Sequence, residues 1–212
     1  MRVFHTGAEI IERPDVFYGQ KNADFGQGFY LTPDRDFACL WGGEGSVVNR
    51  YELELEGLTV KRFERDADWF DYIFHNRRGR DGLDADVVIG PIANDTVFDT
   101  LGMIGSGFLK PEEALRLLEI GPVYTQIALK SPRAAAQLRF LGAEKLPEPD
   151  RERLAREQEA YQRAFAEQME KLAEESGIVR HRRKEGKRLG ANAYGCTDSP
   201  PGVLFTGRGR YA

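Results

Sequence analysis

Residues 50–60, "RYELELEGLTV", alternate apolar and charged side chains, and this pattern limits what the chain can fold into. Tyr51, Leu53 and Leu55 fall on one face of an extended segment, and a glutamate follows each of them. A period of two residues is that of a strand with one face in the core and one face in water. The sequence therefore predicts a half-buried strand here, and with it a β-sheet.

The other predicted elements of residues 1–145 follow in mixed order. The first predicted helix would have Thr32 as its N-cap and Pro33 at its first position. Because strands and helices do not alternate strictly, the predicted fold class is α+β rather than a doubly wound parallel sheet. The predicted strands cover residues 2–5, 28–32, 85–93 and 122–129, and the predicted helices cover residues 32–41, 67–77, 110–120 and 131–141.

The composition changes at Pro147. Residues 148–176 are rich in Ala, Glu, Arg and Gln and contain no Gly. They predict one long amphipathic helix, docked on the preceding domain or on a partner. Its narrow apolar stripe is formed by Leu154, Tyr161, Phe165, Met169 and Leu172. We therefore divide the chain into a domain at 1–145, a charged helix with a basic end at 146–190, and a Gly-rich irregular tail at 191–212.

The charge balance and the cysteines bear on the class of function. The net charge is −4, which argues against general electrostatic binding to nucleic acid but leaves local basic patches open. Residues 75–82 and 180–188 are two such patches, and each is either a phosphate or nucleic-acid contact or a solvated helix end. Cys39 and Cys196 lack metal-ligand spacing, so we expect no metal site. Without a signal pattern or ~20 consecutive apolar residues, we expect a cytoplasmic protein that does not span a membrane.

Two short motifs near the N-terminus can carry chemistry. In "FHTG", His5 ends a short strand, and Thr6 and Gly7 follow it, so an imidazole and an open backbone can both meet a ligand. The alternative is a hydrogen-bonded structural histidine. In "DFGQGFYLT", two glycines precede Phe29 and Tyr30, whose rings would point to opposite faces of a strand. We expect Phe29 to face the core and Tyr30 to face the ligand.

A further aromatic residue and two polar residues extend this candidate site. Trp41 stands eleven residues after Tyr30, on the helix predicted for residues 32–41. The two rings either enclose a slot for a flat heterocycle that bears an amide, or pack in the core. Asn94 and Asp95 follow a predicted buried strand, where they would lie at the edge of a site, although Asp95 also fits a loop or a helix cap.

Taken together, these segments resemble the ADP-ribosyltransferase superfamily, in the branch similar to diphtheria toxin and poly-ADP-ribose polymerase. The segments are "FHTG", "NADFGQGFYLT", "ACLW", "VVNRY", "VVIGPIANDTVFDTL" and "YTQIALKSPRAAAQLRFL", in this order over roughly residues 3–142. The chain is most similar to an uncharacterised bacterial family with DFGxGFYLT and IGPIAND motifs. The resemblance implies an ADP-ribosyltransferase-like split, mixed β-sheet with flanking helices.

The resemblance also implies roles for single residues. His5 matches a histidine that binds a ribose or the adenosine part of NAD, and Tyr30 and Trp41 match the rings that enclose the nicotinamide. Gln126 stands where the superfamily usually has its catalytic glutamate, which hydrogen-bonds the ribose 2′-OH. We therefore expect NAD to bind at His5, Thr6, Gly7, Gly28, Phe29, Tyr30, Trp41 and Asn94, and catalysis to involve His5, Tyr30, Asp95 and Gln126.

Gln126 is the main departure from the superfamily's pattern. A glutamine accepts a hydrogen bond from the 2′-OH, but it neither stabilises positive charge as a carboxylate does nor acts as a general base. Transfer would then be weaker, or use an acceptor that is already nucleophilic, or draw a carboxylate from elsewhere. Ala38 departs too, because polymerase-like relatives have a serine there.

The expected function is NAD-dependent mono-ADP-ribosylation of a macromolecule, either a nucleic acid or a protein, with NAD as co-substrate. Small bacterial transferases of this kind resemble toxins or phage-defence effectors, and the long C-terminal helix would then meet a target or a neutralising partner such as an antitoxin. Two alternatives remain open. One is a catalytically weak module that binds NAD or ADP-ribose, and the other is an NAD glycohydrolase that uses water as the acceptor.

Overall fold

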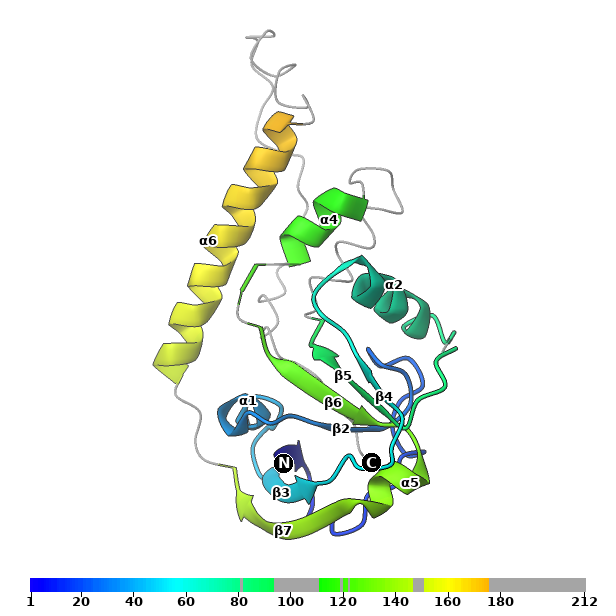
Figure 1. Ribbon diagram of the computed structural model, residues 1–212. Helices are drawn as coiled ribbons and strands as arrows, with labels where there is room; N and C mark the ends of the chain where they lie inside the picture. Colours follow the sequence, from blue (N-terminus) through cyan, green and yellow to red (C-terminus); the bar gives the residue numbers. More distant parts are fainter. Residues whose placement is uncertain (81, 94–110, 119, 122, 147–150, 176–212) are drawn as a thin grey trace, which may run out of the picture.

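The computed structural model describes residues 1–80, 82–93, 111–118, 120–121, 123–146 and 151–175, which form two β-sheets and several helices (Figure 1). The first sheet is antiparallel in the order β1-β3-β7, with β1 at Arg2–Gly7, β3 at Val47–Leu53 and β7 at Leu138–Lys145. The second has the order β2-β6-β5-β4, with β2 at Phe29–Leu31, β6 at Thr125–Leu129, β5 at Val87–Pro91 and β4 at Val60–Arg62. Strands β4 and β5 are parallel and the other pairs are antiparallel. The predicted α+β class is confirmed.

Three of the described helices begin at side chains that cap them. Asp34, Asp66 and Ser131 each accept a hydrogen bond from a backbone N–H of the first turn of α1, α2 or α5. Among the helices in the described ranges, none is both long enough and apolar enough to cross a membrane. The helices are α1 at Arg35–Cys39, α2 at Ala67–Asn76, α4 at Pro111–Leu118, α5 at Pro132–Ala136 and α6 at Arg151–Glu175.

The two sheets are joined through β1 and the end of β2. Phe4 and Thr32 form an antiparallel bridge in which the Phe4 N–H donates to the Thr32 carbonyl at 2.8 Å and the Thr32 N–H donates back at 3.0 Å. β1 then continues into its pairing with β3, and β2 into its pairing with β6. His5 therefore lies where the strands of the two sheets diverge.

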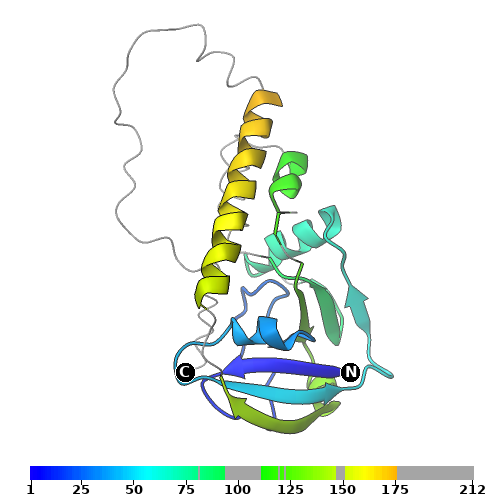
Figure 2. The same cartoon turned by 90° about the vertical axis from the view of Figure 1, so that its left-hand side faces the viewer.

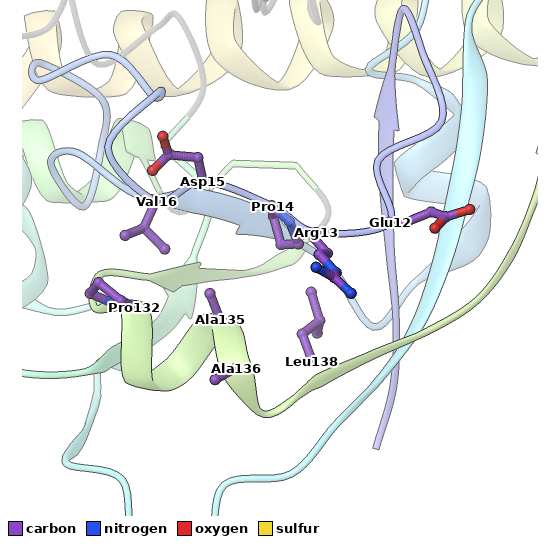
Figure 3. A pocket seen from close by; sticks show the side chains of 9 residues that line it. All are labelled: Glu12, Arg13, Pro14, Asp15, Val16, Pro132, Ala135, Ala136 and Leu138. Carbon is purple, nitrogen blue, oxygen red and sulfur yellow. The ribbon is translucent and has the colours of Figure 1, made fainter.

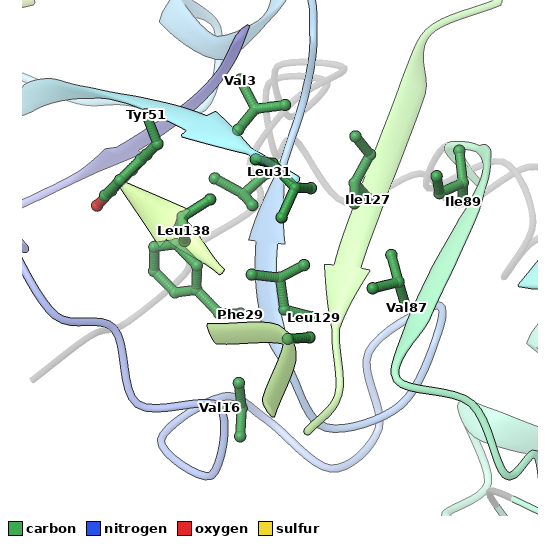
Figure 4. Close-up of a cluster of buried hydrophobic side chains, with 12 residues drawn as sticks. Val3, Val16, Phe29, Leu31, Tyr51, Val87, Ile89, Ile127, Leu129 and Leu138 are labelled. Atoms are coloured by element: carbon green, nitrogen blue, oxygen red, sulfur yellow. The ribbon is translucent and has the colours of Figure 1, made fainter. Parts of the chain in front are cut away.

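The main core lies between the two sheets (Figure 4). Val3 and Tyr51 contribute from the first sheet, and Phe29, Leu31 and Ile127 contribute from the second, each at most 2% exposed. The strand predicted at residues 50–60 is confirmed only in its first part, where Tyr51 and Leu53 are buried in this core. Strand β3 ends at Leu53, and the chain turns before β4 begins at Val60. Burial of apolar area on this scale is the main force that holds the sheets together.

A second core lies on the opposite face of the β2-β6-β5-β4 sheet, beneath α2. Trp69 and Ile73 of α2 pack there with Phe25, Val88 and Ala128, and Tyr30 packs at its edge. Because successive side chains of a strand point to opposite faces, Phe29 and Tyr30 belong to different cores. This separation sets the surroundings of the candidate site.

Helix α6 runs alongside α4 in both views (Figures 1 and 2). Leu172 of α6 and Leu117 of α4 are buried against each other, and Phe165 and Met169 pack at the margin of this contact. Arg116 and Glu175 form an ion pair across the same pair of helices. The predicted apolar stripe therefore docks on the chain's own domain in its last turns, whereas the side chain of Leu154 lies outside the described residues.

Two predicted helices are wrong in extent. The first begins at Arg35, because Thr32 is held in the bridge to Phe4 and Asp34 becomes the N-cap. This helix ends at Cys39, so Trp41 lies beyond it. The helix predicted for residues 131–141 ends at Ala136, and strand β7 begins at Leu138, where pairing with β3 outweighs local helix propensity.

Candidate functional site

His5 occupies the divergence between β1 and β2. Its side chain is 2% exposed, and its Nδ1 lies 2.8 Å from the backbone carbonyl of Tyr30. A carbonyl only accepts, so Nδ1 carries the proton and Nε2 of the neutral ring is an acceptor. Burial lowers the pKa of His5 to about 4, although the hydrogen bond to Tyr30 acts in the opposite direction. At neutral pH, His5 is therefore an uncharged imidazole whose Nε2 can accept a hydrogen bond from a hydroxyl.

The next two residues of β1 shape the surroundings of His5. A Cβ placed on Gly7 would lie 3.2 Å from His5 Nε2, which is tighter than most real Cβ contacts. Glycine at this position therefore leaves room beside the imidazole. The Thr6 hydroxyl donates to the Ala38 carbonyl at 2.6 Å, so its buried side chain ties β1 to α1. Any contact that Thr6 and Gly7 make with a ligand through their backbone stays a prediction.

Trp41 lies close to His5 and to a group of other rings. The Trp41 and His5 rings meet edge-on with centroids 6.5 Å apart, and the Trp41 and Phe37 rings do so at 5.3 Å. Phe37 stacks in turn on Tyr124, with centroids 4.0 Å apart and planes 5° from parallel. Tyr124 stands two residues before Gln126. These ring contacts therefore connect the His5 part of the site to β6, and no local pattern in the sequence pointed to Phe37 or Tyr124.

The side chain of Tyr30 is held on the face of the second sheet that lies beneath α2. Its hydroxyl donates to the Gly26 carbonyl at 2.7 Å and accepts from the Phe25 N–H at 2.9 Å. Its half-buried ring packs with the core beneath α2, whereas Trp41 packs with Phe37 and His5. His5 links the two predicted ring positions, because it contacts the backbone of Tyr30 and the ring of Trp41. A nicotinamide slot between Tyr30 and Trp41 stays a prediction.

Gln126 lies on the same face of the second sheet as Tyr30 and is 5% exposed. Its Nε2 donates to Asp24 Oδ2 at 2.9 Å, and the same oxygen accepts from the Ala93 N–H at 3.1 Å. The other oxygen, Asp24 Oδ1, accepts from Arg77 Nε at 2.8 Å and from Arg77 Nη2. A carboxylate therefore does lie beside Gln126, and it comes from the first residue of the "DFGQGFYLT" motif.

Sequence reasoning missed both members of the Asp24–Arg77 pair. The composition of residues 75–82 indicates a solvated helix end or a phosphate contact, yet the Arg77 side chain is only 8% exposed and Asp24 only 11%. Burial of an arginine requires a partner of opposite charge, and Asp24 supplies it. Asp24 does stand in a quoted motif, but nothing local to residue 24 or residue 77 indicates that they meet.

Of the remaining predicted site residues, two are in the described structure and two are not. Phe29 is buried between the sheets, which confirms its predicted orientation toward the core, and its ring contacts that of His5 with centroids 4.5 Å apart. Gly28 lies against β6, where a Cβ would come within 2.7 Å of the Leu129 carbonyl oxygen. Asn94 and Asp95 lie outside the described residues, as does the basic run at 180–188.

A cavity of about 450 Å³ lies elsewhere on the molecule, between residues 12–16 and helix α5 (Figure 3). Its lining includes the apolar side chains of Val16, Ala135 and Leu138 and the charged side chains of Glu12 and Arg13. None of the described candidate residues lines it. The candidate site is therefore defined by its hydrogen bonds and ring contacts rather than by this cavity.

Comparison with known proteins agrees with the extent of the sequence motifs. No curated protein matches the chain. One family model does match, over residues 1–140, which include β1, β2, β6 and every described candidate residue. By that match, the chain belongs to the family described as "Protein of unknown function (DUF3990)".

Proposed function

We propose that this protein has an ADP-ribosyltransferase-like fold and transfers ADP-ribose from NAD to a macromolecule, releasing nicotinamide. The observation that carries the proposal is His5, a buried neutral imidazole at the divergence of two sheets, bonded to the Tyr30 backbone and facing Trp41. This is the arrangement expected if His5, Tyr30 and Trp41 correspond to the NAD-binding positions of the superfamily.

Each residue would have a distinct part in binding. His5 Nε2 would accept a hydrogen bond from a ribose hydroxyl, which needs the neutral ring that burial favours. Trp41, which is half-buried, would offer ring surface to the nicotinamide. Gly7 would keep the space beside His5 open to the ligand. Gln126 Oε1 would accept a hydrogen bond from the ribose 2′-OH.

The reaction breaks the glycosidic bond between C1′ of the ribose and the nicotinamide nitrogen, and the bonding electron pair leaves with nicotinamide. A nucleophile of the acceptor then forms a new bond to C1′ and loses its proton to solvent. Gln126 cannot act as a general base. The acceptor that fits best is therefore one that is nucleophilic without deprotonation, such as a ring nitrogen of a nucleobase. Resemblance alone extends this proposal to a bacterial toxin or phage-defence effector.

One observation favours a second candidate function, a module that binds NAD or ADP-ribose without turnover. Within the described residues, Gln126 contacts the carboxylate of Asp24, and both of its oxygens are already engaged by Arg77, Ala93 and Gln126. Such a carboxylate is less able to stabilise the positive charge that develops on the ribose than a free one. Turnover would then be slow although NAD binds.

The test uses the full chain with NAD labelled in the adenosine part, in the presence of DNA, RNA or cell lysate. Label on a macromolecule together with released nicotinamide supports the transferase. Nicotinamide released without label transfer supports an NAD glycohydrolase instead, and binding without release supports the module. Trp41→Ala should weaken NAD binding, whereas Phe74→Ala on α2 is a control aromatic substitution outside the described site. Failure of NAD to bind would contradict all three.

A further inference from the structure

We propose that Asp24 is a positioning residue, which fixes the orientation of the Gln126 amide so that Oε1 faces the ligand. The inference rests on the proposed function, because it concerns the same site. Its basis is one contact, between Asp24 Oδ2 and the Gln126 side-chain amide at 2.9 Å.

The chemistry of the two groups decides which amide atom faces Asp24. An ionised carboxylate can only accept hydrogen bonds, whereas an amide has one accepting oxygen and one donating nitrogen. Gln126 must therefore turn Nε2 toward Asp24 and Oε1 away from it. Oε1 is then the atom that can accept a hydrogen bond from a ribose hydroxyl, as the oxygen of a glutamate would.

Asp24 is itself held firmly enough to do this. Arg77 donates to Oδ1 from two nitrogens, and the Ala93 N–H donates to Oδ2. Asn76 Nδ2 donates to the backbone carbonyl of Asp24 at 3.0 Å. Helix α2 and the end of β5 thus fix both the carboxylate and the backbone of residue 24. Charge-assisted bonds of this kind are stronger than neutral ones. Asp24 therefore sets the orientation of the Gln126 amide, and Gln126 does not set that of Asp24.

The same contact gives a physical reason for glutamine at position 126. A glutamate there would place a second carboxylate within hydrogen-bond distance of Asp24, and two like charges so close cannot both stay ionised. Gln126 therefore donates a hydrogen bond that Asp24 accepts. If the amide and the carboxylate swap positions, with asparagine at 24 and glutamate at 126, a donor and an acceptor still face each other.

The exchange gives a sharp test. In Asp24→Asn, the side-chain oxygen stays with the Arg77 donors, so the new nitrogen replaces Oδ2. This nitrogen no longer accepts from the Ala93 N–H and faces Gln126 as a donor, so the Gln126 amide turns over and presents Nε2 to the ligand. In Gln126→Glu, two carboxylates face each other. In the double variant Asp24→Asn/Gln126→Glu, the amide at position 24 donates to one oxygen of the carboxylate at position 126, and the other oxygen faces the ligand. We expect nicotinamide release to fall by roughly tenfold to a hundredfold in each single variant. Most of this loss should be recovered in the double variant, which still lacks the bond from the Ala93 N–H.

Asp86→Asn is the matched control, because Asp86 also accepts a backbone N–H, a side-chain donor and an arginine but has no contact with Gln126 in the described structure. It should leave the rate of nicotinamide release unchanged at temperatures well below its unfolding. If Asp24 were merely structural, the loss in the double variant would equal or exceed the sum of the single losses, which would overturn the inference. Faster release by Gln126→Glu alone would overturn it as well.

A second readout is independent of activity. In protein labelled with ¹⁵N, the side-chain amide signal of Gln126 is identified by its loss in Gln126→Glu. We expect slow exchange of its protons with solvent in the wild type and fast exchange in Asp24→Asn. Fast exchange in the wild type would contradict the inference even if Asp24→Asn did not fold. The wild-type protein could also show slow exchange but neither bind NAD nor release nicotinamide. That result would support the role of Asp24 in orienting Gln126 and would reject the proposed function.

Discussion

Two aspartates at opposite ends of the β5–β6 pair accept similar hydrogen bonds but differ in what those bonds hold. Asp86, just before β5, accepts from the Ser131 hydroxyl, the Thr59 N–H and Arg133. Asp24 accepts from Gln126, the Ala93 N–H and Arg77. The partners of Asp86 cap a helix and join strands, whereas those of Asp24 include a candidate catalytic residue.

The set of hydrogen bonds that a carboxylate accepts therefore does not by itself reveal its role. Both networks combine a backbone donor, a side-chain donor and a guanidinium. They differ in the exposure of the arginine, which is 8% for Arg77 and 60% for Arg133. The Asp24 network should therefore contribute more to stability, and it alone should affect chemistry at Gln126. Four measurements test this difference between the two networks.

Arg77→Ala should have the largest effect on stability. It leaves the Asp24 carboxylate buried without its main counter-charge, a change that costs roughly 3–5 kcal/mol in the free energy of unfolding. Urea unfolding followed by circular dichroism measures this loss. The variant Arg77→Ala/Asp24→Leu removes the buried charge as well and should recover part of it. A loss below about 1 kcal/mol for Arg77→Ala would mean that the buried ion pair contributes no more than an exposed one.

His5 should make stability depend on pH in a defined window. Its folded-state pKa is about 4 and its unfolded value is 6.5, so the unfolded chain binds the proton more readily between these values. The contribution is fully present above pH 6.5 and declines as the pH falls toward 4, by up to about 3 kcal/mol. In His5→Asn, whose amide can still donate to the Tyr30 carbonyl, this segment of the curve should flatten. Parallel curves for the two proteins from pH 7 to pH 4 would contradict the burial of a neutral imidazole.

Asp86→Asn should have a smaller effect, in a more acidic window. The hydrogen bonds from Ser131 and Thr59, together with Arg133, hold the pKa of Asp86 at about 2, below its ordinary value of 3.8. The stabilisation is therefore present above about pH 4 and is lost as the pH falls toward 2. At neutral pH, the substitution should cost about 1 kcal/mol, because solvent screens part of these interactions, and urea unfolding measures the loss. An unchanged unfolding free energy would show that an amide at position 86 replaces the carboxylate without loss.

Much of the fold could be predicted from local sequence, and the site could be predicted only in part. Alternation predicted the strand that contains Tyr51, and the Ser131-Pro132 pair predicted the start of α5. Strand β7 was missed, because "AAAQLRFL" has the composition of a helix and only its pairing with β3 makes it a strand. Local patterns therefore predict helices and strands, but they do not predict the tertiary contacts that override helix propensity.

The site likewise contains residues that short motifs indicate and contacts that no local pattern indicates. His5, Tyr30 and Gln126 stand in short motifs that a sequence comparison can recognise. Arg77 meets Asp24 across 53 positions of sequence, and Gln126 meets Asp24 across 102, so no local pattern encodes these contacts. The composition around Arg77 even indicates the opposite, a solvated basic turn. The ion pair between Asp24 and Arg77 can be recognised only from the folded structure, in which the two side chains lie together.

Arg133→Ala should have the smallest effect of the four. Arg133 donates to Asp86 and to the Gly57 carbonyl, but most of its side chain is in water, where ion pairs contribute about 0–1 kcal/mol. Asp86 keeps its bonds to Ser131 and Thr59, so the carboxylate is not left without donors. The small loss should shrink further in about 1 M salt, because screening weakens exposed pairs, whereas the loss from Arg77→Ala should change little. If the two arginine variants lost equal stability and responded equally to salt, burial would not be what distinguishes the two ends of the β5–β6 pair.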